Sequence, residues 1–309
     1  MARHAPTLLA LALLVVTATA FAVTEHLKLQ PSPILEPRVD TLFSPVCGCP
    51  QEEARIAFSL RSPGTVTLTV VDEKRDTVRT LVSRRHYGRE PVRLAWDGRY
   101  SDGRLVPDGT YRLRLDLPRR APILMPNRIQ VDTRAPRPRV VSTTRPVISP
   151  DGDDRFDGIT LDYRLDEPAK ATLLVGDHVH ERKKLAGTAG RFRWYGKLGP
   201  RRLPRGTYRL SIAATDDAGN TSQPTPPVAV RVRFVELARR TIRVPQRAGF
   251  GLRVRTDARR FRWRLGARRG SARAGLLVLR APRRAGRFYL YVEANGHADR
   301  ARIVVTPRQ

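Results

Sequence analysis

The stretch Gly109-Thr110-Tyr111-Arg112-Leu113 decides the fold of this chain, because it returns unchanged as Gly206-Thr207-Tyr208-Arg209-Leu210. A tryptophan turn precedes each copy, Trp96-Asp97-Gly98 in the first and Trp194-Tyr195-Gly196 in the second. Self-similarity over a long spacing is the sequence signature of a repeated structural unit. The middle of the chain therefore holds two copies of one domain, each about 100 residues long.

The alignment of the two copies extends toward the N-terminus, where Phe43-Ser44-Pro45 falls on Ile148-Ser149-Pro150 at an offset of 105 residues. The next matches are apolar at alternate positions: Ile56, Phe58 and Leu60 fall on Leu161, Tyr163 and Leu165. A period of two is typical of strands that bury one face, and turn dipeptides such as Asp97-Gly98 separate these runs. Short alternating strands between turns predict an all-β chain of tandem β-sandwiches.

The region 236–309 keeps this strand pattern but lacks the repeated motifs. Phe288, Leu290 and Val292 alternate with more polar neighbours, and Asn295-Gly296 follows them as the strongest short hairpin signal in the chain. We expect a smaller, basic β-sandwich here.

The stretch from Trp96-Asp97-Gly98 to Pro107-Asp108-Gly109-Thr110-Tyr111 resembles the Ig-like domain of the flagellar hook-capping protein FlgD and of many bacterial surface proteins. The second copy departs from this pattern at Tyr195 and Arg205, where the first copy has aspartates. The resemblance implies tandem extracellular Ig-like modules without a reaction of their own. On physical grounds Trp96 belongs between the sheets, and the Tyr111 hydroxyl is expected to bond back to the backbone at a corner.

The N-terminus predicts export. No residue from Ala5 to Thr24 is charged, and these twenty residues are just enough to span a bilayer as a helix. Ala18-Thr19-Ala20 is also a small-x-small cleavage site. Residues 1–24 are therefore a transmembrane signal anchor or a cleaved signal peptide. The predicted location is the cell membrane, single-pass with extracytoplasmic C-terminal domains; the alternative is secretion after cleavage.

The expected organisation of the remaining chain follows from these motifs. A Pro-rich spacer is expected first, and three sandwiches follow it. The ranges are 25–37 for the spacer, 38–134 for the FlgD-type Ig-like domain, 135–235 for the second Ig-like repeat and 236–309 for the smaller basic domain.

Positive charge is concentrated in the last domain. The chain carries 58 Lys and Arg against 29 Asp and Glu, and 52 of these cations are Arg. Residues 38–134 carry a net charge of +6, residues 135–235 carry +7 and residues 236–309 carry +16. A coding bias toward Arg would act on all three alike, so the excess needs another cause. Arg262 and Arg264, on one face of a strand, are the candidate contacts to a polyanion, with a solvated surface as the alternative.

The partners of an exported chain are expected in the cell envelope. A polymer of the envelope, an anionic lipid or an envelope protein fits this location, and nucleic acid does not. The N-terminal helix would supply contact with the membrane.

Two short segments are candidates for stabilising the first loop of each repeat. Cys47 and Cys49 lie in an exported segment, where a disulfide persists; pairing between chains and free or metal-bound thiols are the alternatives. The aligned loop of the second repeat is rich in carboxylates that suit Ca²⁺, unless they form only a solvated acidic turn. The candidate metal ligands are Asp151, Asp153, Asp154 and Asp157.

The sequence predicts no catalytic residues. It predicts no cofactor with certainty, and Ca²⁺ in the acidic loop is the one possible cofactor. It contains no G-x-S-x-G, H-E-x-x-H or P-loop motif. The expected function is that of a non-catalytic, membrane-anchored Ig-like surface protein for envelope binding or scaffolding. The alternative is an accessory subunit that presents or contacts a separately encoded envelope enzyme.

Overall fold

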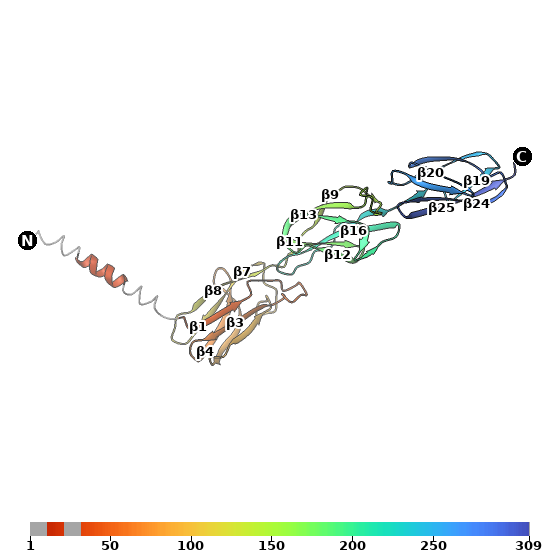
Figure 1. Cartoon of the computed structure of the whole chain (residues 1–309). Coiled ribbons are helices and arrows are strands. Elements are labelled where there is room, and N and C mark those ends of the chain that lie inside the picture. Colours follow the sequence, from red (N-terminus) through yellow and green to blue (C-terminus); the bar gives the residue numbers. More distant parts are fainter. Residues whose placement is uncertain (1–10, 22–31, 309) are drawn as a thin grey trace, which may run out of the picture. The chain divides into compact units, whose positions relative to one another are not determined.

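The computed structural model describes residues 11–21 and 32–308. Residues 11–21 form a short exposed helix, and the rest of the described chain consists of strands and the turns between them (Figure 1). Within these described ranges, no helix is both long and apolar enough to cross a membrane. The remaining parts of the 1–24 segment and most of the 25–37 spacer lie outside the described residues. The chain divides into two compact units, 1–133 and 134–309.

The first unit contains one β-sandwich. Its smaller sheet has the strand order β1-β3-β6 and its larger sheet the order β2-β8-β7-β4-β5. Alternate residues of these strands pack a single core that includes Phe43, Trp96 and Leu113. The strands are β1 (Ile34–Val39), β2 (Leu42–Phe43), β3 (Ala54–Leu60), β4 (Gly64–Val71), β5 (Thr77–Tyr87), β6 (Val92–Trp96), β7 (Gly109–Asp116) and β8 (Ile123–Val131).

The first strand begins earlier than the sequence indicated. β1 starts at Ile34, so residues 34–37 belong to the sandwich and not to the spacer. β1 pairs with β3 at the edge of its sheet, and its register shifts between Leu35 and Arg38, where Pro37 stands. Proline is tolerated in an edge strand beside a bulge, because the N–H that it lacks is not needed for pairing there.

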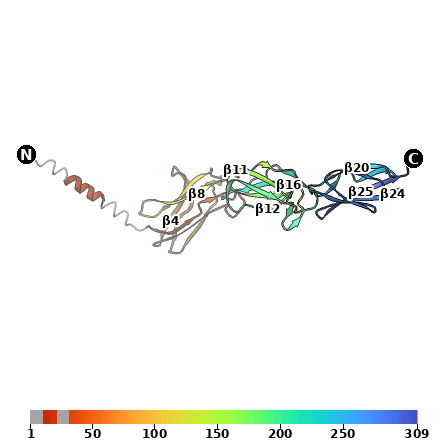
Figure 2. The ribbon, with the colours of Figure 1, turned by 45° about the horizontal axis from the view of Figure 1, so that its top comes forward.

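The second unit opens with the second sandwich, which repeats the first. Its long strand β11 pairs with β9 and β13 through its first part and with β12 and β16 through its last part, so one strand serves both sheets (Figures 1 and 2). The same stretch of the first repeat is divided into β3 and β4. The strands are β9 (Arg139–Thr143), β10 (Val147–Ile148), β11 (Ile159–Val175), β12 (His178–Arg182), β13 (Gly187–Trp194), β14 (Lys197–Leu198), β15 (Arg201–Arg202), β16 (Gly206–Thr215) and β17 (Val228–Val232).

The third sandwich follows in the same unit and has its own core, around Phe261, Leu290 and Ile303. Its sheets have the orders β18-β20-β23 and β19-β25-β24-β21-β22. Asn295-Gly296 connects β24 to β25, which confirms the predicted hairpin. The strands are β18 (Glu236–Leu237), β19 (Thr241–Pro245), β20 (Gly249–Arg255), β21 (Phe261–Leu265), β22 (Arg268–Ala272), β23 (Gly275–Arg280), β24 (Gly286–Ala294) and β25 (His297–Thr306).

The second and third sandwiches contact each other through a buried carboxylate and an aromatic stack. Asp299 is 6% exposed, accepts the Leu237 N–H at 2.9 Å and pairs with Arg205 of the second sandwich at 3.3 Å and with Arg240 of the third. Burial alone would raise the pKa of Asp299, but hydrogen bonds from the Leu237 N–H, from Arg240 and from the Arg300 N–H outweigh it and hold the pKa below its usual value. Phe234 stacks on His297 with ring centroids 3.6 Å apart.

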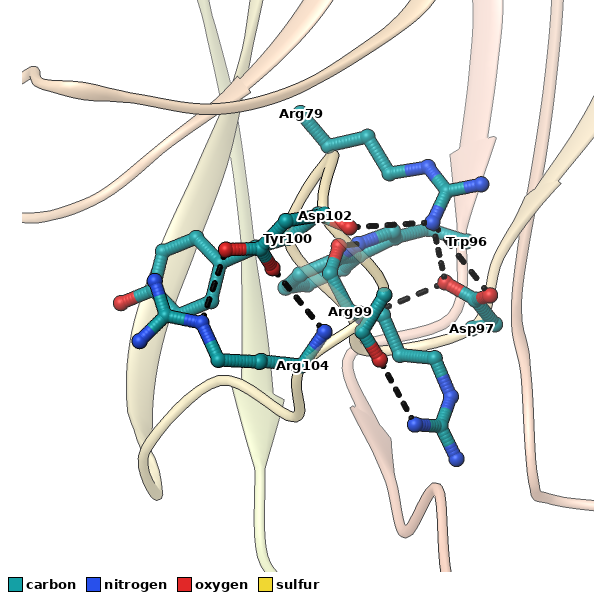
Figure 3. Close-up of polar contacts among 8 residues, drawn as sticks. Arg79, Trp96, Asp97, Arg99, Tyr100, Asp102 and Arg104 are labelled. Atoms are coloured by element: carbon teal, nitrogen blue, oxygen red, sulfur yellow. Dashed lines mark hydrogen bonds and ion pairs between the residues drawn. The ribbon is translucent and has the colours of Figure 1, made fainter.

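The tryptophan turn fixes each repeat in the same way. Trp96 Nε1 donates to the Arg99 carbonyl at 3.1 Å, and the Asp97 carboxylate accepts the Arg99 N–H and pairs with Arg79, both at 3.2 Å (Figure 3). Trp194 Nε1 donates to the Lys197 carbonyl at 2.8 Å, so the bond survives although Tyr195 replaces the aspartate. These contacts mark the turn as a determinant of the fold.

The tyrosine corner predicted for Tyr111 is confirmed. Its hydroxyl donates to the Pro107 carbonyl at 2.7 Å, and Tyr208 makes the same bond to Pro204 at 2.7 Å. Burial raises the pKa of Tyr111 to about 12, as expected for a phenol that is packed against the core.

Candidate functional site

The first loop of each repeat closes through the same backbone hydrogen bond. The Ser44 N–H donates to the Gln51 carbonyl at 3.1 Å, and the Ser149 N–H donates to the Phe156 carbonyl at 2.8 Å. These pairs align at the offset of 105 residues that relates the repeats. The two loops therefore share one pair of anchor points, although their sequences around these points differ.

In the first repeat the loop contains a disulfide. The structure joins Cys47 to Cys49 with their Cα atoms 5.2 Å apart. Gly48 between them has a φ of 59°, a left-handed conformation that glycine adopts without steric cost.

In the second repeat a carboxylate accepts hydrogen bonds from the loop backbone. Asp157 accepts the N–H of Gly152 with one oxygen and that of Asp154 with the other, both at 2.9 Å. The side chain of Asp154 is exposed. Asp153 uses one oxygen to accept the Arg155 N–H at 2.9 Å. Of the four candidate ligands, Asp157 therefore acts as a backbone clamp.

The remaining two candidate ligands meet a carboxylate from the third sandwich. Asp151, Asp153 and Asp257 each present an oxygen, and these oxygens lie within 4.8 Å of one another. Asn295, in the hairpin between β24 and β25, donates its side-chain amide to Asp153 at 3.0 Å. The acidic loop of the second domain is thus completed by two residues of the third.

Three oxygens of this acidic cluster are buried without a hydrogen-bond donor. One oxygen of Asp151 and both oxygens of Asp257 have less than 1 Å² of exposed surface each and no partner. Burial raises the pKa of both carboxyls, and the neighbouring carboxylate of Asp153 adds to this effect. A buried carboxylate that lacks a donor is costly unless a cation or a proton neutralises it.

The two arginines predicted to contact a polyanion each contact another side chain of the third domain. Arg262 pairs with Glu293 at 2.8 Å, and the guanidinium of Arg264 lies 5.0 Å from the centre of the Tyr291 ring. Both side chains are exposed on β21. Their contact with a polyanion stays a prediction.

The arginines of the third domain form a larger positive surface than this pair. All twenty arginines in 236–309 are exposed, whereas none of the four carboxylates of this region is. Asp299 is buried, and Glu236 and Glu293 are held by ion pairs with arginines. Little negative charge on this domain remains to balance the guanidinium groups.

Sequence reasoning missed Asp257 and Asn295 as members of the acidic cluster. The Asn295-Gly296 turn was visible as a hairpin signal, but nothing in a strand pattern shows which loop of another domain a hairpin tip contacts. Asp257 stands out only as one of four acids in an otherwise basic domain.

No model of a known protein family matches the chain, and the search of curated proteins found no relative. Solved structures that resemble it at low identity include tandem modules. The fibronectin(III)-like modules of Clostridium thermocellum CbhA are 13% identical, with a TM-score of 0.34 over 64% of this chain and 94% of that one. The titin fragment I67–I69 is 9% identical, with a TM-score of 0.36 over 91% of this chain and all of that fragment.

A third structure, domains 1–5 of Sidekick-1, is 15% identical, with a TM-score of 0.28 over 89% of this chain and 60% of that one. At such identities and TM-scores these likenesses carry no conclusion about this chain. Its fold of consecutive β-sandwiches rests on its own strand pairing.

Proposed function

We propose that this chain is an exported, non-catalytic surface protein that binds an anionic polymer of the cell envelope through its third domain. The observation that supports this function is the charge on that domain, where all twenty arginines are exposed and no carboxylate is. Guanidinium groups on a rigid sandwich create a positive potential that attracts polyanions and anionic headgroups. The first domain then acts as a spacer between the N-terminal segment and the second unit.

The test compares the two compact units, 1–133 and 134–309, as fragments 32–133 and 134–309. Each is mixed with isolated envelope stripped of lipid, and separately with vesicles of phosphatidylglycerol and phosphatidylcholine. Fragment 134–309 should bind the stripped envelope, and the bound fraction should fall steeply as salt screens exposed charges over about 10 Å. Because the two fragments differ widely in net charge, equal binding would contradict binding through the charge of the third domain. Binding to vesicles alone would identify lipid as the partner.

We also propose that the N-terminal segment holds the chain in the membrane with residues 38–309 outside, as the charge pattern around residues 5–24 predicts. The domain at 38–134 would then be a surface module of the FlgD-type Ig-like class, without a role in hook assembly. Protease added to intact protoplasts should remove the sandwiches. Their full protection, beside an intact cytoplasmic control protein, would contradict this topology.

A second candidate property concerns the acidic cluster. We propose that it holds a divalent cation, with Ca²⁺ as the best fit to an all-oxygen ligand set. The three buried carboxylate oxygens without a donor favour Asp151, Asp153 and Asp257 as ligands. Asp157, already committed to two backbone N–H groups, would shape the loop instead.

A further inference from the structure

An open cavity of about 780 Å³ lies within the second unit, between loops of its two sandwiches. One wall comes from residues 145–149, 155–156 and 233, and the other from residues 256–260 and 273–274. Cavities of this volume are of the size that holds small organic ligands. Six of the lining residues are arginines: Arg145, Arg155, Arg233, Arg259, Arg260 and Arg273.

The cavity gathers more positive charge than its own residues balance. Asp257 is the single acid in its lining, and in the described part of the chain none of the six arginines forms an ion pair with a carboxylate. Arg260 bonds instead to Ser271, whose hydroxyl lies 3.0 Å from its Nε. Like charges that converge on one cavity repel one another, and an anion in their midst offsets this repulsion.

An exposed aromatic ring stands at the same cavity in a strained backbone conformation. Phe156 is 45% exposed and has a φ of 53°, which is a steric outlier for a bulky residue. The guanidinium of Arg145 lies 4.5 Å from the centre of its ring. The first repeat has Gln51 at the aligned position. Strain of this kind persists where the surrounding structure enforces it, and it is common at ligand sites.

We propose that this cavity binds a phosphate-bearing sugar or polyol, with its phosphates on the arginines and its carbon skeleton against Phe156. The inference rests on the proposed function, because it assigns a defined site and a ligand class to the anion binding of the same unit. Arg145, Arg155 and Arg233 come from the second domain and Arg259, Arg260 and Arg273 from the third, so the ligand also holds the two domains together.

Charge density selects phosphate over carboxylate as the anionic group. Several arginines share a cavity of limited volume, so the ligand must carry several negative charges in little space. Phosphate groups meet this condition and accept paired hydrogen bonds from a guanidinium. A carboxylated sugar carries fewer charges in the same volume.

The first experiment measures binding of inorganic tripolyphosphate to the full chain by isothermal titration calorimetry. The variant R145Q/R259Q removes one guanidinium from each wall, and R209Q/R302Q removes two exposed arginines that do not line the cavity. The variant R145Q/R259Q should bind tripolyphosphate about tenfold more weakly or worse, because each substitution removes charge-assisted hydrogen bonds to the ligand. The control variant has the same net charge and should change affinity by less than about twofold.

Two results would overturn the cavity as the site. Equal losses in the two variants would contradict it while leaving the proposed surface binding in place, because net charge alone would then set the affinity. Citrate that binds as tightly as tripolyphosphate would contradict phosphate as the anionic group. A full chain that binds neither tripolyphosphate nor stripped envelope would overturn both the cavity and the proposed function.

The second experiment distinguishes the contribution of the Phe156 ring to binding from that of the arginines. Asparagine tolerates a positive φ better than phenylalanine, so F156N should fold and melt at the same temperature or higher. Its affinity for glucose 1-phosphate should fall about threefold or more because the contact with the sugar is lost, while its affinity for tripolyphosphate should not change. A parallel loss for both ligands would show that Phe156 acts on the loop and not on the sugar.

Discussion

The first loops of the two repeats show how one framework accommodates two different surfaces. Both loops are closed by the same backbone hydrogen bond, and both stand beside the same tryptophan turn. Beside these shared contacts the first repeat has the Cys47–Cys49 disulfide, and in the second the carboxylate of Asp157 accepts two backbone N–H groups. The buried contacts are therefore shared, and the exposed loop chemistry is free to differ.

The glycine of the tryptophan turn is part of the shared framework. Gly98 has a φ of 66° and Gly196 a φ of 63°. A Cβ on Gly98 would come within 2.9 Å of Pro45, and one on Gly196 within 2.7 Å of Pro150. The close approach of this turn to the proline of the first loop explains why both motifs recur together in the sequence.

The largest expected effect tests the shared part of the comparison. Trp96→Ala and Trp194→Ala should each lower the free energy of unfolding by about 3–5 kcal/mol, because both side chains are completely buried and bond to a carbonyl. Urea denaturation of fragments 32–133 and 134–309, followed by circular dichroism, measures the two costs. A large difference between them would contradict an equivalent role in the two repeats.

Alkaline pH should separate the two tyrosine corners. The pKa of Tyr111 is raised from 10.0 to about 12, so the stability it contributes is fully present below pH 10 and is lost as pH rises toward 12. Burial also raises the pKa of Tyr208, which is less deeply buried. Fragment 32–133 should thus lose about 2 kcal/mol of its free energy of unfolding over this range, measured by urea denaturation at each pH. The variant Tyr111→Phe should remove this part of the pH dependence.

The carboxylate clamp of the second repeat is expected to be worth about 2 kcal/mol. Asp157→Ala removes two hydrogen bonds to a charged group and leaves the N–H groups of Gly152 and Asp154 without them. Asp154→Asn, in the same loop with an exposed side chain, keeps a residue that tolerates the left-handed φ of 62° at this position, so it is the matched control and should stay within about 0.5 kcal/mol. Thermal melts of fragment 134–309 compare the two, and equal effects would remove Asp157 from its assigned role.

The disulfide of the first repeat should contribute less. A ring closed across a single residue restricts few conformations of the unfolded chain, so the double variant Cys47→Ser/Cys49→Ser should cost about 1–2 kcal/mol. Reductant should lower the melting temperature of fragment 32–133 to a similar extent and leave fragment 134–309 unchanged. An intact mass of fragment 32–133 that shows two free thiols before reduction would contradict the disulfide.

The comparison also shows how far the sequence predicts this molecule. The repeat, the tyrosine corner and the Asn295-Gly296 hairpin depend on local spacing, and the sequence predicted all three. The start of β1 at Ile34 was missed because three prolines indicated a spacer, although an edge strand tolerates Pro37. The contact of Asp257 with the acidic loop could not be predicted, since it depends on how two domains pack and not on any periodicity.

The smallest expected effect concerns the cation, and it returns to the difference between the loops. At Ca²⁺ about tenfold above its dissociation constant, binding should stabilise fragment 134–309 by about 1.4 kcal/mol, a shift of roughly 3–5 °C. Fragment 32–133 should not respond. A fragment that ended before Asp257 would lack one of the proposed ligands, so the test requires both domains of the second unit.

The variant Asp257→Asn makes this last prediction specific, because two effects of opposite sign meet at one residue. Burial raises the pKa of Asp257, so its charge destabilises the fold at neutral pH, and this penalty disappears as pH falls below the raised pKa. In chelator at pH 7, Asp257→Asn should therefore melt higher than the parent fragment, and in Ca²⁺ it should lose the stabilisation. Asp154→Asn should keep the full Ca²⁺ response. A response to Ca²⁺ that survives Asp257→Asn but disappears in Asp154→Asn would place the cation in the exposed part of the loop, away from the third domain.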